Sequence, residues 1–306
     1  VGSEMCIRDS LWFTSTRDIS LVNFRYRRFK YIPVLPNQEV RSLLTDSRGN
    51  TWAGTYEGQL ALFDADSRLL GYIGKDGSLQ KGKTNFANRI YALREDNKGR
   101  VWIGTKGDGV YVLYRDGTLR HYTNSTTDVY SLSNNDIYDI DIDNRNHIWI
   151  ASFDGGLNLV DESGGKIRFI NYRNDMKQYP DSLYIRKVRR VTHDNKGAVI
   201  LSTSGGLVSF SDDFSRPDKI HFYINQHVRG DETSLMGNDV MQTLVTRNGK
   251  VVVVTMGGGV QELTSAGVLG DDLKFGSLTD VHTDDNIVQS VVEDNKGDVW
   301  IIREGS

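Results

Sequence analysis

The chain has 306 residues, of which 38% are hydrophobic and 25% are charged, and its formal net charge is −3 at neutral pH. This composition is typical of a folded globular protein and not of a disordered one, and the small negative charge gives no overall attraction to nucleic acid or anionic lipid. No apolar stretch approaches the roughly 20 residues that a membrane-spanning helix requires.

The first ten residues, VGSEMCIRDS, match no later part of the chain and contain its single cysteine, Cys6. Later segments place Asp-x-x-Gly before a tryptophan, and this one does not. We therefore expect residues 1–10 not to be native and residues 11–306 to contain the repeats. Without Cys6 the chain has no cysteine, which is in keeping with an oxidising compartment.

A short phrase then recurs along the chain. It reads EDNKGRVWIGTKGDGVYVL from Glu95, with related versions from Thr45, Ile142, His193 and Thr246. Aligned on the tryptophan, the anchor positions are 40 to 52 residues apart and are Trp12, Trp52, Trp102, Trp149, Ile200, Val252 and Trp300. Periods of this length are typical of the four-stranded blades of β-propellers.

Each repeat contains short runs of β-branched and aromatic residues separated by turn signals. In the unit of Trp102, residues 90–95 and 101–105 are predicted strands, and residues 96–99 between them form a tight hairpin. A glycine cluster precedes a third strand, and a looser segment completes the unit. No segment has a sustained helical period. The sequence therefore predicts an all-β fold, a β-propeller of four-stranded blades with about six to seven blades represented.

These repeats resemble the two-component regulator propeller repeat, whose pattern is V-x-x-I-x-x-D-x-x-G-x-x-W-I-G-T-x-x-G-G-L, often after a Ser-Leu-Ser-Asn-Asn segment. The stretch SLSNNDI from Ser131 matches this lead-in closely, and SLMGNDV from Ser234 matches it more loosely. The resemblance extends from Leu11 to Arg303. The units of Ile200 and Val252 depart from it, because they lack both the tryptophan and the Gly-Thr pair.

Proteins with this repeat are typically the periplasmic sensor regions of hybrid two-component histidine kinases of Bacteroidetes, which respond to oligosaccharides and control glycan-utilisation genes. The resemblance implies that this chain is a piece of such a sensor, without kinase activity of its own and without a cofactor. It further implies a periplasmic location, a homodimer formed through the sensor region, and a membrane tether supplied by C-terminal parts outside this chain.

A variable column of residues is the strongest candidate for a ligand site. An apolar residue lies twelve positions before each anchor, and the next residue varies among Arg41, Tyr91, Tyr138, Arg189, Met241 and Gln289. In a propeller these side chains would lie at the channel mouth, where the innermost strand starts, and the residues after the second strand would join them. Tyrosine and arginine can stack on a sugar ring or bind its hydroxyls and carboxylates. The predicted ligand-binding residues are Arg41, Tyr56, Tyr91, Lys106, Tyr138, Phe153 and Arg189. The alternative is that these side chains fill the channel or contact a second subunit.

Two other functions remain open, an interaction scaffold without a small ligand and a propeller glycosidase or lyase. Such an enzyme needs two converging carboxylates, and the variable column contains none; the nearest are Asp136 and Asp139. Asp139, Asp141 and Asp143 alternate along one predicted strand, and we interpret them as a solvated strand face rather than a calcium site. The six histidines have no metal-ligand spacing. No catalytic residue and no metal ligand are therefore predicted.

Residues 24–31, FRYRRFKY, interleave basic and aromatic side chains, as nucleic-acid-binding segments do. Because the chain is acidic overall, we interpret them instead as an outer strand of a blade and expect no nucleic-acid partner.

Overall fold

The computed structural model describes the backbone of residues 4–7, 10–14, 19–23, 28–31, 35, 38–278 and 288–303. The regular structure in these ranges is β-strand, apart from a single 3-10 turn, η2 (Pro217–Lys219). Within the same ranges, no helix is long and apolar enough to cross a membrane. The prediction of an all-β fold is confirmed.

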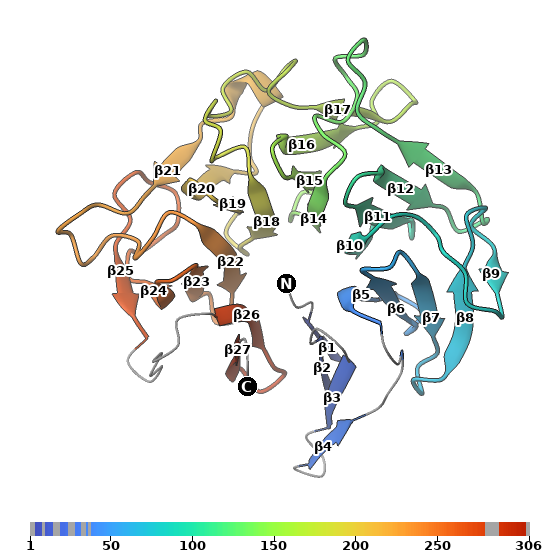
Figure 1. Cartoon of the computed structure of the whole chain (residues 1–306). Coiled ribbons are helices and arrows are strands. Elements are labelled where there is room, and N and C mark those ends of the chain that lie inside the picture. The colour runs from blue at the N-terminus through green and yellow to red at the C-terminus, as the bar shows by residue number, and fades with distance from the viewer. Residues whose placement is uncertain are drawn as a thin grey trace. The chain divides into compact units, whose positions relative to one another are not determined.

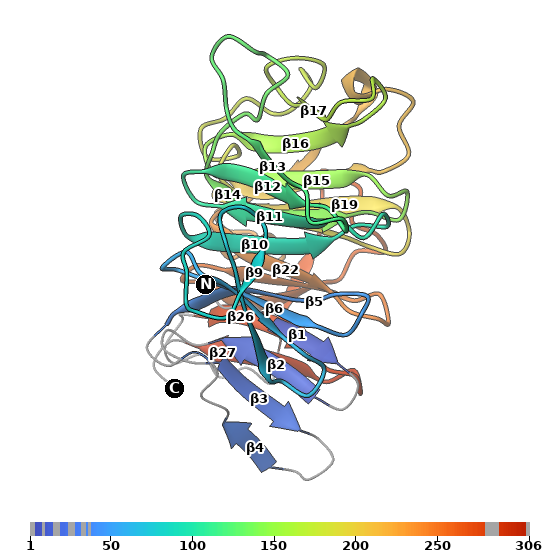
Figure 2. The ribbon, with the colours of Figure 1, turned by 90° about the vertical axis from the view of Figure 1, so that its right-hand side faces the viewer.

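Consecutive strands pair in chain order, so each sheet is an antiparallel meander (Figure 1). The first sheet contains β1 (Glu4–Ile7), β2 (Ser10–Thr14), β3 (Ile19–Asn23) and β4 (Arg28–Tyr31). The second contains β5 (Val40–Thr45), β6 (Thr51–Thr55), β7 (Leu60–Phe63), β8 (Leu69–Ile73) and the short β9 (Leu79–Gln80). The third contains β10 (Ile90–Glu95), β11 (Val101–Thr105), β12 (Gly109–Leu113) and β13 (Leu119–Tyr122), and the first three of these also lie side by side in the turned view of Figure 2.

The remaining sheets follow the same plan. The fourth contains β14 (Ile137–Ile142), β15 (Ile148–Ser152), β16 (Gly156–Asp161) and β17 (Arg168–Ile170). The fifth contains β18 (Val188–His193), β19 (Ala198–Thr203), β20 (Gly206–Ser211) and β21 (Tyr223–Asn225). The sixth contains β22 (Val240–Val245), β23 (Val251–Thr255), β24 (Gly259–Leu263) and β25 (Phe275–Ser277), and the described part of the seventh contains β26 (Val288–Glu293) and β27 (Val299–Arg303).

These sheets are the blades of a β-propeller, and each predicted anchor lies in the second strand of its blade. Five of the sheets have the predicted four strands, and the second gains β9 as a fifth. In the first blade, Met5 of β1 pairs with Trp12 of β2, so a strand precedes this anchor within residues 1–10. The sequence-based expectation that these ten residues are not native stays a prediction. The segment expected to be an outer strand forms β4 at the edge of its sheet over Arg28–Tyr31, and its residues 24–27 lie outside the described ranges.

The chain divides into two compact units. Unit 1 comprises residues 1–123, 135–137 and 292–299, and unit 2 comprises residues 124–134, 138–291 and 300–306. Each unit has its own buried hydrophobic clusters.

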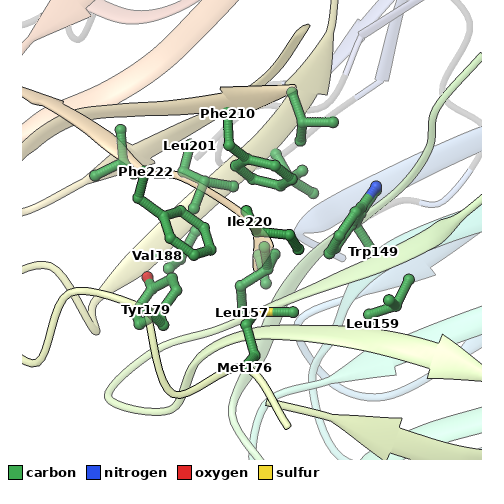
Figure 3. Close-up of a cluster of buried hydrophobic side chains, with 14 of the residues drawn as sticks. Trp149, Leu157, Leu159, Met176, Tyr179, Val188, Leu201, Phe210, Ile220 and Phe222 are labelled. Carbon is green, nitrogen blue, oxygen red and sulfur yellow. The ribbon is translucent and has the colours of Figure 1, made fainter. Parts of the chain in front are cut away.

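In unit 2, the anchor Trp149 packs between two blades, as its size predicts. Its fully buried ring meets Phe210 of β20 edge-on, with 5.0 Å between the ring centroids. Figure 3 shows Trp149 and Phe210 among the buried side chains of this cluster, together with Leu157, Val188 and Phe222. The anchor Ile200 is also fully buried, and it belongs to a second cluster shared with the β22–β25 blade.

The glycine of the Trp-Ile-Gly-Thr phrase makes a close approach between blades possible. A Cβ atom added at Gly104 would lie 2.6 Å from Cγ2 of Ile137 at the start of the next blade. The equivalent atom at Gly54 would lie 2.5 Å from Cγ2 of Ile90. Both distances are too short for real carbon atoms, so these two strand positions require glycine for packing rather than for turning.

The aspartates that alternate along β14 do not form a solvated face, so that interpretation was wrong. Asp141 and Asp143 are both 4% exposed. Asp139 accepts a hydrogen bond from the backbone N–H of Val191 at 3.0 Å, and Asp141 lies 2.6 Å from Nδ1 of His193, so both carboxylates join β14 to β18 of the next blade. Asp139 of β14 thus satisfies a backbone N–H at the edge of β18, which has no strand paired on that side in the described part of the chain. Covering a strand edge with side chains is one way in which proteins protect it.

Candidate functional site: a rim of bulged strand starts

The predicted apolar column marks the first residue of the first strand in six blades. Its members are Val40, Ile90, Ile137, Val188, Val240 and Val288, and all are 4% exposed or less. The variable residue that follows is therefore the second residue of the strand. This placement agrees with the sequence-based prediction.

A β-bulge occurs at this variable residue in four blades, those whose first strands start at Val40, Ile90, Val188 and Val240. The pairing skips one position between Val40 and Ser42, and the same skip leaves out Tyr91, Arg189 and Met241 in their blades. A bulge leaves the extra residue out of the ladder and re-aims its side chain, and bulges are common beside binding sites. The column is thus a repeated local distortion as well as a place of variable sequence.

In each of these four bulged blades, two loops are tied together beside the bulge. The N–H of Tyr56 donates to the carbonyl of Glu39 at 2.7 Å, and the N–H of Lys106 donates to the carbonyl of Arg89 at 2.8 Å. In unit 2, the N–H of Met256 donates to the carbonyl of Asp239 at 2.8 Å. The rim of a blade is defined here as three residues: the one before the first strand, the bulged one, and the one after the second strand.

The rim of unit 1 is a cluster of cations and tyrosines. The guanidinium of Arg41 lies 5.3 Å from the ring centroid of Tyr56 and 5.5 Å from that of Tyr91. Arg89 covers Tyr56 at 4.2 Å, and Nζ of Lys106 lies 5.9 Å from the centroid of Tyr91. Each of these five side chains is half-buried, so they pack on one another and still face solvent. All four rim residues predicted in this unit are brought together.

The rim of unit 2 combines a stacked aromatic pair with ion pairs. Tyr138 and Phe153 stack with 4.7 Å between their centroids and 19° between their planes, and the guanidinium of Arg189 lies 5.3 Å from the centroid of Phe153. Arg189 also donates from Nε and Nη2 to the two carboxylate oxygens of Asp239, each at 3.0 Å. Lys187 lies over Phe153 at 5.6 Å. The three residues predicted here therefore also form one cluster.

Sequence reasoning missed the rim residues that directly precede the first strand. Glu39 forms an ion pair with Arg41, and Arg89, Lys187 and Asp239 make the contacts described above. Their position immediately before the apolar column was a usable signal. The variable residue Met241 packs instead against a hydrophobic cluster, and the side chain of Gln289 lies outside the described part.

The two carboxylates considered for an enzyme have separate partners. The backbone of Asp136 bridges to Lys106 in unit 1, whereas Asp139 is bonded to Val191 in unit 2. Among the residues that the structure describes, no group of three histidine, cysteine, aspartate or glutamate side chains could hold a metal ion. An open depression of about 560 Å³ in unit 2 contains no rim residue and is lined by Asn174, Asp175, Lys177, Gln178 and residues 216–219.

Comparison with known proteins identifies the repeat. Residues 34–57 and 86–107 match the two component regulator propeller family, and these ranges contain Arg41, Tyr56, Tyr91 and Lys106 of the unit 1 rim. These two ranges are two-component regulator propeller repeats. The second matched range includes the Trp-Ile-Gly-Thr phrase and the Asp-x-x-Gly hairpin before it.

The chain is also similar to parts of signalling proteins. Histidine kinase P4 of Formosa agariphila is 23% identical over 170 residues, which are 52% of this chain and 12% of that protein, so the chain spans about an eighth of its relative's length. The extracellular domain of a Bacteroides thetaiotaomicron protein assigned as a hybrid two-component system is 19% identical over 99% of this chain and 46% of its own, with a TM-score of 0.43.

Other structures share only the fold. Virginiamycin B lyase of Staphylococcus aureus has a TM-score of 0.67 at 13% identity, over 98% of this chain and 90% of its own. This similarity supports the propeller architecture.

Proposed function

We propose that the chain is the ligand-sensing propeller region of a hybrid two-component system, that it lies in the periplasm, and that its rim binds an oligosaccharide. The observation that carries the proposal is the bulged start of the first strand. In unit 1 this distortion places Arg41 and Tyr91 beside Tyr56, with their side chains only half-buried. Rings and guanidiniums presented in this way suit the apolar faces and the hydroxyls of sugars.

The variation of the rim from blade to blade supports a specific ligand. The bulged residues are arginine in two described blades, tyrosine in one and methionine in another, while the apolar residue before each is always buried. A structural role alone would favour similar residues in equivalent blades, whereas an asymmetric ligand requires different ones.

The region acts in this proposal without catalysis, as a module that alters its packing against a second copy when ligand binds. Blades are closely packed, so a local event is passed on most readily through an interface that has two arrangements. Phosphotransfer would occur in other parts of the protein, as the similarity to a histidine kinase over an eighth of its length suggests.

Thermal-shift screening of the chain against plant and host oligosaccharides tests the proposal. A ligand present at 100 times its Kd should stabilise the fold by roughly 2.7 kcal/mol. We expect a specific hit whose shift is lost in Tyr91→Ala and in Arg41→Ala, both in the rim of unit 1. Tyr223→Ala, on the outer strand β21, is the matched control and should respond like the unmodified chain. A hit that survives both rim substitutions would contradict a rim site.

A scaffold that binds another protein is the second candidate, because apolar side chains stand exposed on loops of unit 2. Met256 of the rim is 62% exposed and Tyr184 is 59% exposed. If no oligosaccharide stabilises a well-folded sample, this candidate is favoured. Sedimentation at increasing concentration would then show whether the partner is a second copy, with Met256→Ser weakening the association.

A further inference from the structure

The rim of unit 1 contains a guanidinium that has no carboxylate partner within the described part of the chain. Arg89 lies with its Cζ atom 4.2 Å from the ring centroid of Tyr56. The other two rim arginines are occupied differently. Arg41 forms an ion pair with Glu39, and Arg189 forms a two-pronged pair with Asp239.

The contact with Tyr56 prepares Arg89 to bind an anion. When the flat face of a guanidinium lies over an aromatic ring, its N–H donors remain free at its edge and point outward within the guanidinium plane. Because the contact holds that plane, less side-chain freedom is lost when two parallel hydrogen bonds form to an anion. Arg89 is half-buried, so its edge is reachable and its charge is less screened than that of a fully exposed arginine.

The charges around Arg89 favour an anion as well. The cations of this rim are Arg41, Arg89 and Lys106, and its carboxylates are Glu39 and Asp136. Glu39 is paired with Arg41. These five rim side chains carry one net positive charge, and a further carboxylate, that of Asp108, is hydrogen-bonded to Asn88, the residue before Arg89.

We propose, as a refinement of the proposed function, that the ligand is an oligosaccharide with an anionic group, a carboxylate or a sulfate, that binds the edge of Arg89. The sugar ring that carries this group contacts the adjacent tyrosines Tyr56 and Tyr91. In unit 2, the guanidinium of Arg189 already makes such a pair of hydrogen bonds to a carboxylate of the chain itself, that of Asp239. The rim of unit 1 therefore favours an anionic oligosaccharide over a neutral one.

Titration calorimetry of the 306-residue chain tests this refinement with three probes of equal length. The probes are a galacturonic acid trimer, a neutral galactose trimer and a sulfated galactose trimer. We expect at least one anionic trimer to bind more tightly than the neutral one, and its affinity to fall as salt is raised. Which anionic trimer binds distinguishes a carboxylate from a sulfate.

Two variants of Arg89 and one control variant test whether Arg89 binds the anionic group. Arg89→Met should weaken the anionic trimer by roughly 10- to 100-fold, as expected for the loss of charge-assisted hydrogen bonds, and should leave any binding of the neutral trimer unchanged. Arg89→Lys keeps the positive charge but cannot form two parallel hydrogen bonds, so its loss of affinity for the anionic trimer should be smaller than that of Arg89→Met. Arg216→Met removes an exposed arginine remote in sequence and should change nothing.

The outcomes separate this refinement from the proposed function. If the neutral trimer binds as tightly as the anionic ones, with a dependence on Tyr91, or if Arg89→Met binds the anion normally, the anionic class is wrong and a rim site for sugars stands. If none of the three trimers binds the folded chain, the refinement fails. The broader panel of oligosaccharides then decides the proposed function by itself.

Discussion

In three blades, the aspartate at the first hairpin does more than start a turn. Asp46 accepts hydrogen bonds from the backbone N–H groups of Arg48 and Asn50 at 3.0 and 2.8 Å, and from the indole N–H of Trp52 at 3.0 Å. The aspartates of the next two blades bond their own anchors in the same way, since Trp102 and Trp149 each donate at 2.8 Å. One carboxylate thus fixes both the hairpin and the orientation of the tryptophan that packs between blades.

This arrangement makes the stability of the fold sensitive to acid. Burial by itself would raise the pKa of Asp46, but the hydrogen bonds from Trp52, Asn50 and Arg48 hold that pKa below its ordinary value of 3.8. A depressed pKa in the folded state means that the stabilisation is present above the unfolded value, about 3.9, and is lost as the pH falls through the folded pKa.

Asp46→Asn should therefore destabilise the chain by about 1–3 kcal/mol at pH 7, because an amide N–H would replace the oxygen that faces the indole N–H. The difference from the unmodified chain should shrink as the pH falls below about 4, since protonation removes the same acceptor from Asp46. Urea unfolding at several pH values measures this. Asp64→Asn is the control, because Asp64 caps a similar turn at an exposed position without a tryptophan. A loss of stability for Asp46→Asn that does not depend on pH would contradict the explanation.

The strand glycines lead to a second prediction at this scale. Gly104→Ala places a Cβ against Ile137 and should cost about 1–3 kcal/mol through overpacking between blades. Gly82→Ala, where an added Cβ meets nothing within 4 Å, should leave stability nearly unchanged. Thermal unfolding of both variants decides the matter. Equal stability of the two would show that the blades tolerate a wider gap.

At the scale of the element, the lead-in segments before two blades are clamped by buried amides. The N–H of Ser133 donates to Oδ1 of Asn158 at 2.9 Å, and the N–H of Met236 donates to Oε1 of Gln261 at 2.8 Å. Asn158 and Gln261 each occupy the third position of their blade's third strand. The Ser-Leu segments are thereby held against the blades that they introduce, with Leu132 and Leu235 buried.

Asn158→Leu should release the segment of residues 124–134 from its blade. The variant leaves the N–H of Ser133 without its buried acceptor, at a cost of about 1–3 kcal/mol. Amide hydrogen exchange should become faster in this segment and remain unchanged in β22–β25. Gln178→Leu, an exposed amide of the same unit, is the control. Unchanged exchange in residues 124–134 would mean that the clamp does not hold them.

The sequence predicted the elements better than the contacts between them. The repeat period placed the anchors in second strands, and the apolar column placed the strand starts, because both depend on local patterns of hydrophobicity. The bulge at Tyr91 and the contact of Arg89 with Tyr56 could not be read in this way, since they depend on register and on a side chain about one repeat away. The same limitation explains why the alternation of Asp139 and Asp141 predicts a solvated strand face that the structure does not have.

For the whole molecule, the account combines a stiff scaffold with a variable rim. Buried anchors and glycines at close approaches recur from blade to blade, whereas the bulged residues and their loop neighbours differ. Such a molecule can change its ligand by substitutions at the rim without altering its core. The proposed sensor function rests on this separation.

The central claim is that the unit 1 rim binds the ligand, and titration of the best oligosaccharide from the screen into a Tyr56→Ala/Tyr91→Ala variant tests it most directly. Loss of two stacking rings should weaken binding by roughly tenfold or more while the thermal stability of the unliganded chain stays close to that of the Tyr223→Ala control. Unchanged affinity in the double variant, with binding retained at full stoichiometry, would contradict the account.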